Sequence, residues 1–492
     1  MKPPFDALLI ANRGEIARRI QHACRELGVR SVAVHSEVDA AAPFAREADA
    51  AVALEGASAA ETYLNVEKLL DAAKRSGARA VHPGYGFLSE NEAFARAVIE
   101  AGLVWVGPPP EAIAAMGTKA RARAIAREAG VPVVPGTTED GQGDAQLLAE
   151  AERIGWPVLL KASAGGGGKG MRVVSRKAEF GEALAATRRE AQSAFGDAKL
   201  ILEKYVNNPR HIEVQIFGDA RGNVVHLFER ECSIQRRHQK VLEESPSPAL
   251  DDATRKAITG AAVALAEAVG YEGAGTVEFI LDEAGKFYFL EMNTRLQVEH
   301  PVTEWVTGLD LVALQLRVAA GEALPFSQAD VALRGHAIEA RLYAEDPATQ
   351  FAPQTGTIEL LRLAGGPGVR WDVGVEQGSL ISPHYDPMLG KLIVHGADRP
   401  AALRRLRRAL RETAVLGLVT NLDLLAAVAA HPAFAAGETT TAFIETHFAD
   451  WRAKEPETWE WAALAAFETW GKTRAPAAGE AAPAFDPWAL DG

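Results

Sequence analysis

The stretch KASAGGGGKGM at residues 161–171, continued by Arg172-Val-Val174, decides the first interpretation of the fold. Apolar residues typical of strands stand on both sides of a run of glycines, which predicts a strand, a loop and a second strand. The glycines let the backbone approach a ligand closely, and Lys161 and Lys169 supply positive charge. This combination suits a mobile flap that closes over a polyphosphate, although a flexible hairpin tip would have the same pattern.

Two common nucleotide-binding loops are excluded at this stretch. Ser163 stands where a P-loop needs its first glycine, and Gly170 replaces the required Ser or Thr. Gly165, Gly167 and Gly170 formally satisfy G-x-G-x-x-G, but a strand follows them, so no helix N-terminus would lie behind the phosphates.

A second polar pattern lies at residues 287–299. From Glu291 to Glu299 every second residue is charged or an amide, which predicts one packed face and one polar face if the segment is extended. A hairpin with its turn at residues 282–286 would pair Glu278 with Glu291. Two adjacent carboxylates repel unless a cation lies between them, and with Asn293 they offer the oxygen ligands that Mg²⁺ prefers. The alternative is a solvated strand face.

Length and composition limit the class of protein. The 492 residues suggest about three domains. The formal net charge of −13 disfavours nucleic acid as a partner, because phosphate backbones bind basic surfaces. Cys24 and Cys232 are too few for a disulfide framework, and the apolar run Ala7–Ala11 is too short for a signal peptide or a membrane span. We therefore expect a cytoplasmic protein with no membrane association.

The pattern of elements changes along the chain. Residues 6–110 alternate short strands with helix-like stretches, which is typical of a parallel sheet, yet Asn12-Arg13-Gly14-Glu15 replaces the glycines of a dinucleotide-binding loop. Strands at residues 158–300 form hairpins, and residues 401–415 have the apolar spacing of an amphipathic helix. The predicted fold class is therefore α/β combined with α+β.

With these motifs the sequence closely resembles the biotin carboxylase component of biotin-dependent carboxylases, a branch of the ATP-grasp superfamily. The resemblance covers residues 5–448 and rests on ANRGEIA, HPGYGFLSEN, MGTKARAR, KASAGGGGKGM, HIEVQIFGD, ERECSIQRRHQKVLEE, GTVEFI, EMNTRLQVEHPVTE, GHAIEARLYAED and HYDPMLGKL. It implies an N-terminal parallel-sheet domain at 1–114, an ATP-grasp domain at 115–332 with a mobile glycine-rich lid at 132–206, and a mixed α/β C-terminal domain at 333–448.

The resemblance implies ATP-dependent carboxylation of biotin with bicarbonate, through carboxyphosphate, as the first half-reaction of an acyl-CoA carboxylase. The implied ATP-binding residues are Lys119, Lys161, Gly165, Gly166, Gly167, Gly168, Met171, Glu203, Lys204, Tyr205, Val206, His211, Gln235 and His238. Two Mg²⁺ or Mn²⁺ ions would bind at Glu278, Glu291 and Asn293. Biotin would arrive as a substrate attached to its carrier.

The same resemblance assigns catalytic roles. The catalytic residues would be Glu299, Arg341, Lys240 and Arg295, and bicarbonate would bind at Lys240, Arg295, Gln297 and Val298. Glu299 would deprotonate bicarbonate, and Arg341 would stabilise the enolate oxygen that develops on biotin. The plain alternative for Arg341 is an ion pair with Glu339 on an exposed strand. For Cys232 it is a buried apolar side chain.

Two rival functions stay open at this point: another ATP-grasp carboxylate–amine ligase, and a catalytically silent ATP-binding module retained for assembly. The predicted partners are a biotin carboxyl carrier protein or domain, a carboxyltransferase subunit, and a second copy of the chain in a homodimer or higher oligomer. Residues 449–492 hold five of the nine tryptophans, which predicts a tail that packs. We interpret this tail as a linker and the start of a tether module in a longer subunit.

Overall fold

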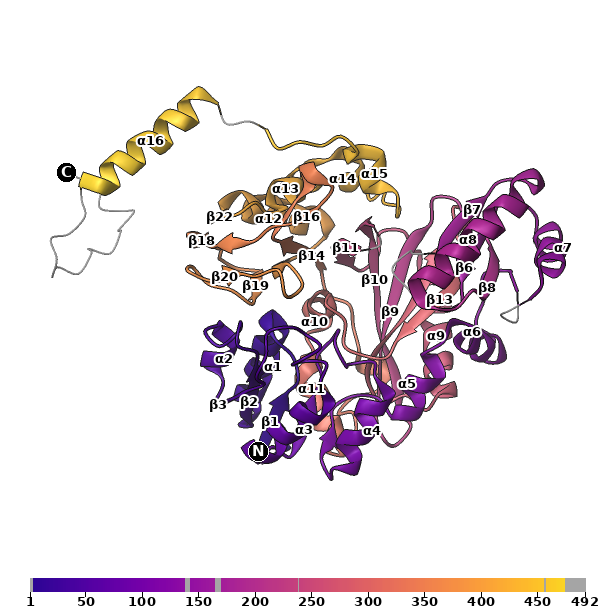
Figure 1. Cartoon of the computed structure of the whole chain (residues 1–492), viewed down its shortest axis with the longest axis horizontal. Coiled ribbons are helices and arrows are strands. Elements are labelled where there is room, and N and C mark those ends of the chain that lie inside the picture. Colours follow the sequence, from indigo (N-terminus) through magenta and orange to yellow (C-terminus); the bar gives the residue numbers. More distant parts are fainter. Residues whose placement is uncertain (1–2, 138–141, 164–169, 238, 455–456, 474–492) are drawn as a thin grey trace. The chain divides into compact units, whose positions relative to one another are not determined.

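The structure is a computed structural model that describes residues 3–137, 142–163, 170–237, 239–454 and 457–473 (Figure 1). The chain divides into two units, Met1–Asp450 and Trp451–Gly492. Within the described ranges, none of the helices has the length and apolar character needed to cross a bilayer.

The N-terminal part of the first unit is a parallel sheet with the strand order β3-β2-β1-β4-β5, drawn in indigo in Figure 1. Its strands are β1 (Ala7–Ile10), β2 (Arg30–His35), β3 (Ala50–Ala53), β4 (Ala80–His82) and β5 (Val104–Trp105). Helices α1 (Gly14–Leu27), α2 (Pro43–Glu47), α3 (Val66–Ser76) and α4 (Glu92–Glu100) connect them. Leu8 and Leu9 enter two different apolar cores, because the sheet is covered on both faces.

The strand order brings two loops together at the carboxyl edge of this sheet. Strands β1 and β4 are neighbours, so the segments that follow them lie side by side. The Asn12 side chain joins these segments by donating hydrogen bonds to the carbonyl oxygens of Pro83 at 2.7 Å and Tyr85 at 2.8 Å. Gly84 has a φ of 65° and its Cβ position would meet the Asn12 amide, so a glycine is required there.

The predicted strand–loop–strand unit is present as part of a small antiparallel sheet with the order β7-β6-β8. The strands are β6 (Val158–Ala162), β7 (Met171–Val174) and β8 (Leu200–Lys204), and Lys161 is paired with Met171. Helices α7 (Asp144–Ile154) and α8 (Phe180–Phe195) cover its apolar core. Two further helices, α5 (Pro110–Met116) and α6 (Lys119–Glu128), precede this region.

An antiparallel sheet of eight strands forms the centre of the unit, in the order β13-β12-β9-β10-β11-β14-β21-β19. The strands are β9 (Arg210–Gly218), β10 (Val224–Arg236), β11 (Gln239–Ser245), β12 (Gly273–Leu281), β13 (Phe287–Asn293), β14 (His336–Tyr343), β19 (Val369–Val373) and β21 (Met388–Gly396). Because β11 pairs with β14, the sheet continues across residue 333, where sequence reasoning places a domain boundary.

The hairpin of β12 and β13 pairs Glu278 with Glu291, as the turn position predicts. The condition that the alternating segment is extended holds only as far as Asn293. Strand β13 ends at Asn293, and the chain then turns into helix α10 (His300–Thr307), which Pro301 in its first turn favours. Helices α9 (Asp252–Ala268) and α11 (Leu311–Ala319) pack beside this sheet.

The C-terminal part of the first unit adds short strands and helices. They are β15 (Glu345–Asp346), β16 (Ala352–Pro353), β17 (Gly356–Thr357), β18 (Leu360–Arg362), β20 (Leu380–Ile381), β22 (Ala414–Leu416), α12 (Arg399–Glu412), α13 (Leu422–Ala430), α14 (Pro432–Ala436) and α15 (Phe443–Phe448). The predicted amphipathic helix is α12, which Asp398 caps by accepting a hydrogen bond from the Ala401 amide.

The second unit contains helix α16 (Thr458–Thr473). Trp459 and Trp461 on this helix are 64% and 59% exposed. Within the described residues of the tail, these two side chains therefore do not show the packing that the tryptophan content predicts.

Candidate active site

A cavity of about 630 Å³ is lined by residues from the N-terminal sheet, helix α6, the three-stranded sheet and the eight-stranded sheet. Segments that are hundreds of residues apart in the sequence thus contribute to one site. The predicted site residues among its lining are Lys119, Lys161, Met171, Glu203, His211, Gln235, Lys240, Glu278, Glu291, Asn293, Arg295, Gln297, Val298 and Arg341.

One part of the cavity concentrates positive charge. Lys161 on β6 is buried and its ammonium contacts the Glu203 carboxylate on β8. Arg123 on α6 contacts the same carboxylate and donates a hydrogen bond of 2.7 Å to the Val134 carbonyl oxygen. Burial and the nearby charges of Lys119 and Arg123 lower the pKa of Lys161 to about 7. A bound polyphosphate would reverse this effect, because a nearby anion favours the protonated ammonium.

The paired carboxylates lie next to this cationic region. Burial and the charge of Glu278 raise the pKa of Glu291. Burial alone would raise the pKa of Glu278 too, but Lys240 and His211 outweigh it and hold that pKa well below the usual range. The side-chain nitrogen of Asn293 is buried without a hydrogen-bond partner in the described structure. Two carboxylates and an amide oxygen fit Mg²⁺, since a divalent cation between the carboxylates would stabilise both as ions.

His211 and Gln235 form a small polar pair on β9 and β10. The Gln235 amide nitrogen lies 2.7 Å from His211 Nδ1, and His211 Nε2 lies 2.9 Å from a Glu278 oxygen. Burial lowers the pKa of His211, but the Glu278 carboxylate outweighs burial and raises it above its ordinary value. Protonated His211 is therefore an ion-pair partner of Glu278.

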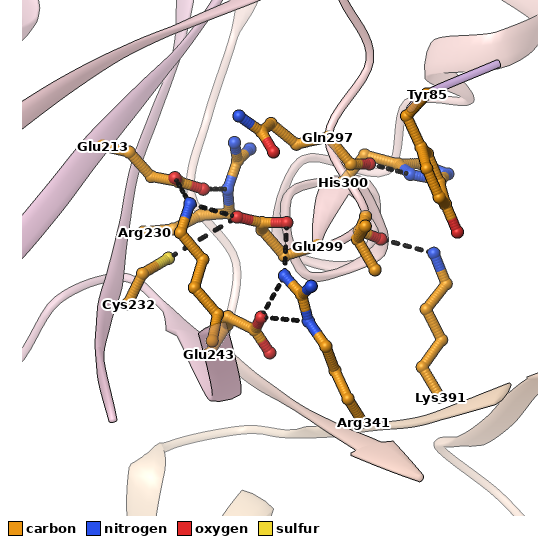
Figure 2. Close-up of polar contacts among 12 residues, drawn as sticks. Tyr85, Glu213, Arg230, Cys232, Glu243, Gln297, Glu299, His300, Arg341 and Lys391 are labelled. Carbon is orange, nitrogen blue, oxygen red and sulfur yellow. Dashed lines mark hydrogen bonds and ion pairs between the residues drawn. The ribbon is translucent and has the colours of Figure 1, made fainter. Parts of the chain in front are cut away.

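Glu299 is fully buried between two cationic side chains (Figure 2). One of its oxygens accepts a hydrogen bond of 2.7 Å from Lys240, and the other accepts one of 2.8 Å from Arg341. Burial would raise the pKa of Glu299, but Lys240, Arg341 and Arg230 together hold it well below its ordinary value. The carboxylate is therefore ionised at neutral pH in this arrangement.

Lys240 also bonds to Glu213 at 2.5 Å and to Glu278 at 2.9 Å, so one ammonium links three carboxylates. Arg230, which is fully buried, holds Glu213 in place and also donates to Thr303 at 2.9 Å. Lys240 and Arg230 each have carboxylate partners, which offset the free energy that burying a charge costs.

Arg341 is buried on β14 and donates a hydrogen bond of 2.6 Å from Nε to Glu243 in addition to its contact with Glu299. The alternative of an exposed ion pair with Glu339 is therefore wrong. The carboxylate of Glu339 is buried and accepts no hydrogen bond among the described residues. Burial raises its pKa well above the ordinary value, which favours its protonated form.

Arg295 and Gln297 complete this end of the cavity. The Arg295 guanidinium donates to Glu90 at 2.8 Å, to Gln297 at 3.0 Å and to Asn293 at 3.0 Å. The Glu90 contact attaches the loop after β13 to the N-terminal sheet domain. Cys232 is buried next to Glu299, with Sγ 4.0 Å from a Glu299 oxygen, and burial raises the pKa of its thiol well above the usual value.

Some predicted residues are not among those that line the cavity, and the buried Glu299 is one of them. Lys204 points its ammonium at the carbonyl oxygens of Gly155 and Trp156, at 3.0 and 2.9 Å, and neither Tyr205 nor Val206 lines the cavity. The glycines Gly165, Gly166, Gly167 and Gly168, and also His238, lie outside the described residues.

Sequence reasoning missed a further wall of the cavity. It consists of Asn12, Arg13, Gly14, Glu15, Ile16, Tyr85, Gly86, Phe87, Arg123, Gln239, Leu290, Tyr343, Tyr385, Asp386 and Met388. Many of these residues stand in the motifs ANRGEIA, HPGYGFLSEN and HYDPMLGKL. These motifs support the family resemblance, but sequence reasoning assigned no site residue in them.

Three successive regions of the chain match known protein families. Residues 4–113 match the N-terminal domain of biotin carboxylase, residues 118–327 match the ATP-binding domain of the carbamoyl-phosphate synthase L chain, and residues 339–446 match the C-terminal domain of biotin carboxylase.

Among similar proteins, the biotin carboxylase of Halalkalibacterium halodurans is 51% identical over 443 residues, which are 90% of this chain and 98% of that protein. The mitochondrial methylcrotonoyl-CoA carboxylase subunit alpha of Rattus norvegicus is 50% identical over 446 residues, 90% of this chain and 62% of that subunit. The chain thus spans about three fifths of the length of that longer relative.

Solved structures give the same answer for the fold. The biotin carboxylase of Campylobacter jejuni, in a beta-gamma-ATP complex, matches with a TM-score of 0.87 and 43% identity over 90% of this chain and 99% of that one. The biotin carboxylase domain dimer of Hydrogenobacter thermophilus 2-oxoglutarate carboxylase, in complex with MgADP, ADP and bicarbonate, matches with a TM-score of 0.88 and 45% identity, over 92% and 99%.

A parallel N-terminal sheet, a small three-stranded sheet, and paired carboxylates on a central antiparallel sheet form the architecture of an ATP-grasp protein. The chain belongs to the biotin carboxylase family. This confirms the predicted family, fold class and enzyme class.

Proposed function

We propose that the chain carboxylates biotin with bicarbonate at the expense of ATP, as the first half-reaction of a biotin-dependent acyl-CoA carboxylase. One observation carries this proposal. The buried Glu299 carboxylate lies between Lys240 and Arg341, and both of these side chains line the cavity that also holds Lys161 and the Glu278–Glu291 pair. A base, anion-binding cations and a phosphate-binding region therefore adjoin one space.

In this proposal the nucleotide phosphates bind near Lys119 and Lys161. Glu278, Glu291 and Asn293 would hold Mg²⁺, which would neutralise phosphate charge and polarise the γ-phosphate. The chain contributes the rest of the electrostatics, because Lys161 becomes fully protonated when an anion binds beside it.

Bicarbonate would bind at Lys240, Arg295, Gln297 and Val298, close to the γ-phosphate. Its oxygen attacks the γ-phosphorus, the bond to ADP breaks, and the bicarbonate proton passes to Glu299. In the present arrangement Glu299 is a weak base, since Lys240 and Arg341 both stabilise its ionised form. An incoming bicarbonate would compete for Lys240, which would weaken that stabilisation and raise the basicity of Glu299 at the moment it is needed.

The resulting carboxyphosphate would break down to CO₂ and phosphate, and the phosphate would accept the ureido proton of biotin. Arg341 would stabilise the enolate oxygen, and the nitrogen of biotin would then attack CO₂. Glu243 keeps the guanidinium of Arg341 oriented through the hydrogen bond of 2.6 Å to Nε.

The two rival functions are less well supported. A carboxylate–amine ligase would share the lysines and the metal carboxylates, but it would have no use for a buried base held between Lys240 and Arg341. A silent ATP-binding module would be expected to have lost at least one of these groups, whereas Lys240, Glu299 and Arg341 are all present and in contact.

The wider assignments are proposals as well. We infer a cytoplasmic protein that works with a biotin carboxyl carrier protein or domain and a carboxyltransferase subunit, and that forms a homodimer or higher oligomer. The domain boundaries proposed are 1–114, 115–332, 333–448 and 449–492, with the last segment leading into a tether module. The sequence contains no Met-Lys-Met triplet, so the biotin would be carried elsewhere.

The test is phosphate release from ATP by the purified chain with Mg²⁺, measured with and without bicarbonate and with and without free biotin. The proposal predicts that hydrolysis requires bicarbonate and increases with biotin. Hydrolysis that is equally fast in bicarbonate-free buffer would overturn it.

A further inference from the structure

The short loop between β13 and α10 carries three of the four predicted bicarbonate-binding residues, Arg295, Gln297 and Val298. Val298 lines the cavity, between Gln297, which also lines it, and the buried Glu299. Among the described residues, the structure gives the Val298 amide no hydrogen-bond acceptor. A backbone N–H at a cavity wall with no protein acceptor is suited to an anion, because a buried donor needs a partner.

The peptide that carries this N–H is fixed from its other side by His300. The Nδ1 atom of His300 lies 2.8 Å from the carbonyl oxygen of Gln297, and the His300 amide donates to the same oxygen over 3.3 Å. Burial and the charge of Lys391 lower the pKa of His300 well below its ordinary value, so the ring is neutral. Since a carbonyl oxygen can only accept, the single ring proton must be on Nδ1.

The next peptide, between Val298 and Glu299, is fixed by Lys391. The ammonium of Lys391 donates to the carbonyl oxygen of Val298, and Figure 2 shows this contact beside that of His300. Lys391 on β21 is fully buried, with the carboxylate of Glu15 at 3.4 Å as its ion-pair partner. Burying an ammonium costs free energy unless polar or charged partners compensate for the lost water. The Glu15 carboxylate and the Val298 carbonyl are the partners of Lys391.

Lys391 and Arg341 are direct neighbours on β21 and β14. Arg341 holds the carboxylate of Glu299, and Lys391 holds the peptide immediately before that residue. The two strands thus fix the proposed base by its side chain and by its backbone.

We propose that His300 and Lys391 are positioning residues, which fix the two peptides on either side of Val298 and so present the Val298 amide and the Glu299 carboxylate to bicarbonate. This inference rests on the proposed function. Each contact also polarises its peptide, because a carbonyl that accepts a strong hydrogen bond makes the N–H of the same peptide a better donor. The donor of the first peptide is the Val298 amide, and the donor of the second is the Glu299 amide.

Glu15 extends this arrangement to the N-terminal sheet. Its carboxylate accepts a hydrogen bond from the Tyr85 hydroxyl, and both residues line the cavity. Lys391 therefore connects the bicarbonate loop to residues from the N-terminal domain and to a strand of the C-terminal domain.

The test uses two variants of similar shape, His300→Asn and His300→Leu. An asparagine amide can place its nitrogen where Nδ1 lies and still donate to the Gln297 carbonyl, whereas leucine cannot. We expect a half-saturating bicarbonate concentration about tenfold higher for His300→Leu than for His300→Asn, because leucine loses the stronger of the two hydrogen bonds to the Gln297 carbonyl, and one buried hydrogen bond is worth about 1 kcal/mol. The dissociation constant for ATP should be the same in both, because neither side chain reaches the nucleotide end of the cavity.

Equal bicarbonate dependence of the two variants would overturn the role of His300, since a merely structural histidine would be replaced equally well or badly by both. If His300→Leu does not fold, Glu15→Gln/Lys391→Met decides in its place, with Glu15→Gln as its matched control. The double variant should raise half-saturating bicarbonate about tenfold above that control, and no difference would refute the proposal. Loss of bicarbonate dependence in the unmodified chain would instead refute the proposed function.

Discussion

Replacing Glu299 with glutamine separates the chemistry of this carboxylate from its structural role. The side chain keeps its shape, and one amide oxygen can still accept from Lys240 or Arg341. Lys240 retains Glu213 at 2.5 Å and Glu278 at 2.9 Å, and Arg341 retains Glu243 at 2.6 Å, so neither cation is left unpaired. The free energy of unfolding should therefore fall by no more than about 3 kcal/mol, the value of one hydrogen bond to a charged group.

The loss of activity should be much larger. Removing a positioned general base lowers turnover by roughly 100-fold to 10,000-fold, whereas ATP affinity should change by less than about twofold because Glu299 does not face the nucleotide. The assay is phosphate release at saturating ATP and bicarbonate, with denaturant unfolding and ATP titration on the same samples. Bicarbonate-dependent turnover within about tenfold of the unmodified chain would remove Glu299 as the base.

A matched control is available in Glu304. It is also buried between two arginines, with Arg19 at 2.7 Å and Arg370 at 2.8 Å, and these arginines hold its pKa below the usual range. The partners of Glu299, Lys240 and Arg341, line the cavity, whereas Arg19 and Arg370 do not. Glu304→Gln should therefore cost similar stability while bicarbonate-dependent turnover changes little, which separates the loss of a buried charge from the loss of a base.

Three further predictions concern other parts of the cavity. Arg341→Ala should leave ATP affinity unchanged and lower carboxybiotin formation by at least about 100-fold, and an equal loss of nucleotide affinity would make Arg341 structural. Because the pKa of Lys161 is lowered to about 7, ATP affinity should fall as pH rises above 7, by up to about tenfold per pH unit, and Lys161→Arg should flatten this slope; an unchanged slope in that variant contradicts the assignment. Glu291→Gln should raise the Mg²⁺ concentration for half-maximal hydrolysis about tenfold, and an unaltered Mg²⁺ dependence argues against a metal ligand.

Local patterns allowed part of this structure to be predicted. The strand–loop–strand unit around Lys161 and Met171 follows from residue type and a glycine run. The pairing of Glu278 with Glu291 follows from the position of one turn, because antiparallel register is fixed by that turn. The bend after Asn293 was missed because alternating polarity alone cannot show where a strand ends, even though Pro301 marks the start of a helix.

Contacts between residues far apart in the sequence could not be predicted, because they depend on the tertiary arrangement of the strands. The only ion-pair partner that sequence reasoning offers Arg341 is its near neighbour Glu339. Its partners are Glu243 on β11 and Glu299 just before α10, both distant in the sequence. The cavity wall at Asn12–Ile16 depends on β1 and β4 being neighbours in the sheet. Hydrophobic periodicity does not specify that order.

The central claim is that bicarbonate attacks ATP and that its carbon then passes to biotin. The most direct measurement supplies bicarbonate labelled in both carbon and oxygen to the purified chain with Mg²⁺, ATP and free biotin, and analyses biotin and phosphate by mass spectrometry. The account predicts labelled carbon in carboxybiotin and one labelled oxygen in each phosphate released, because carboxyphosphate breaks at its carbon–oxygen bond. Phosphate that carries no label from bicarbonate, or biotin that gains no carbon, would contradict it.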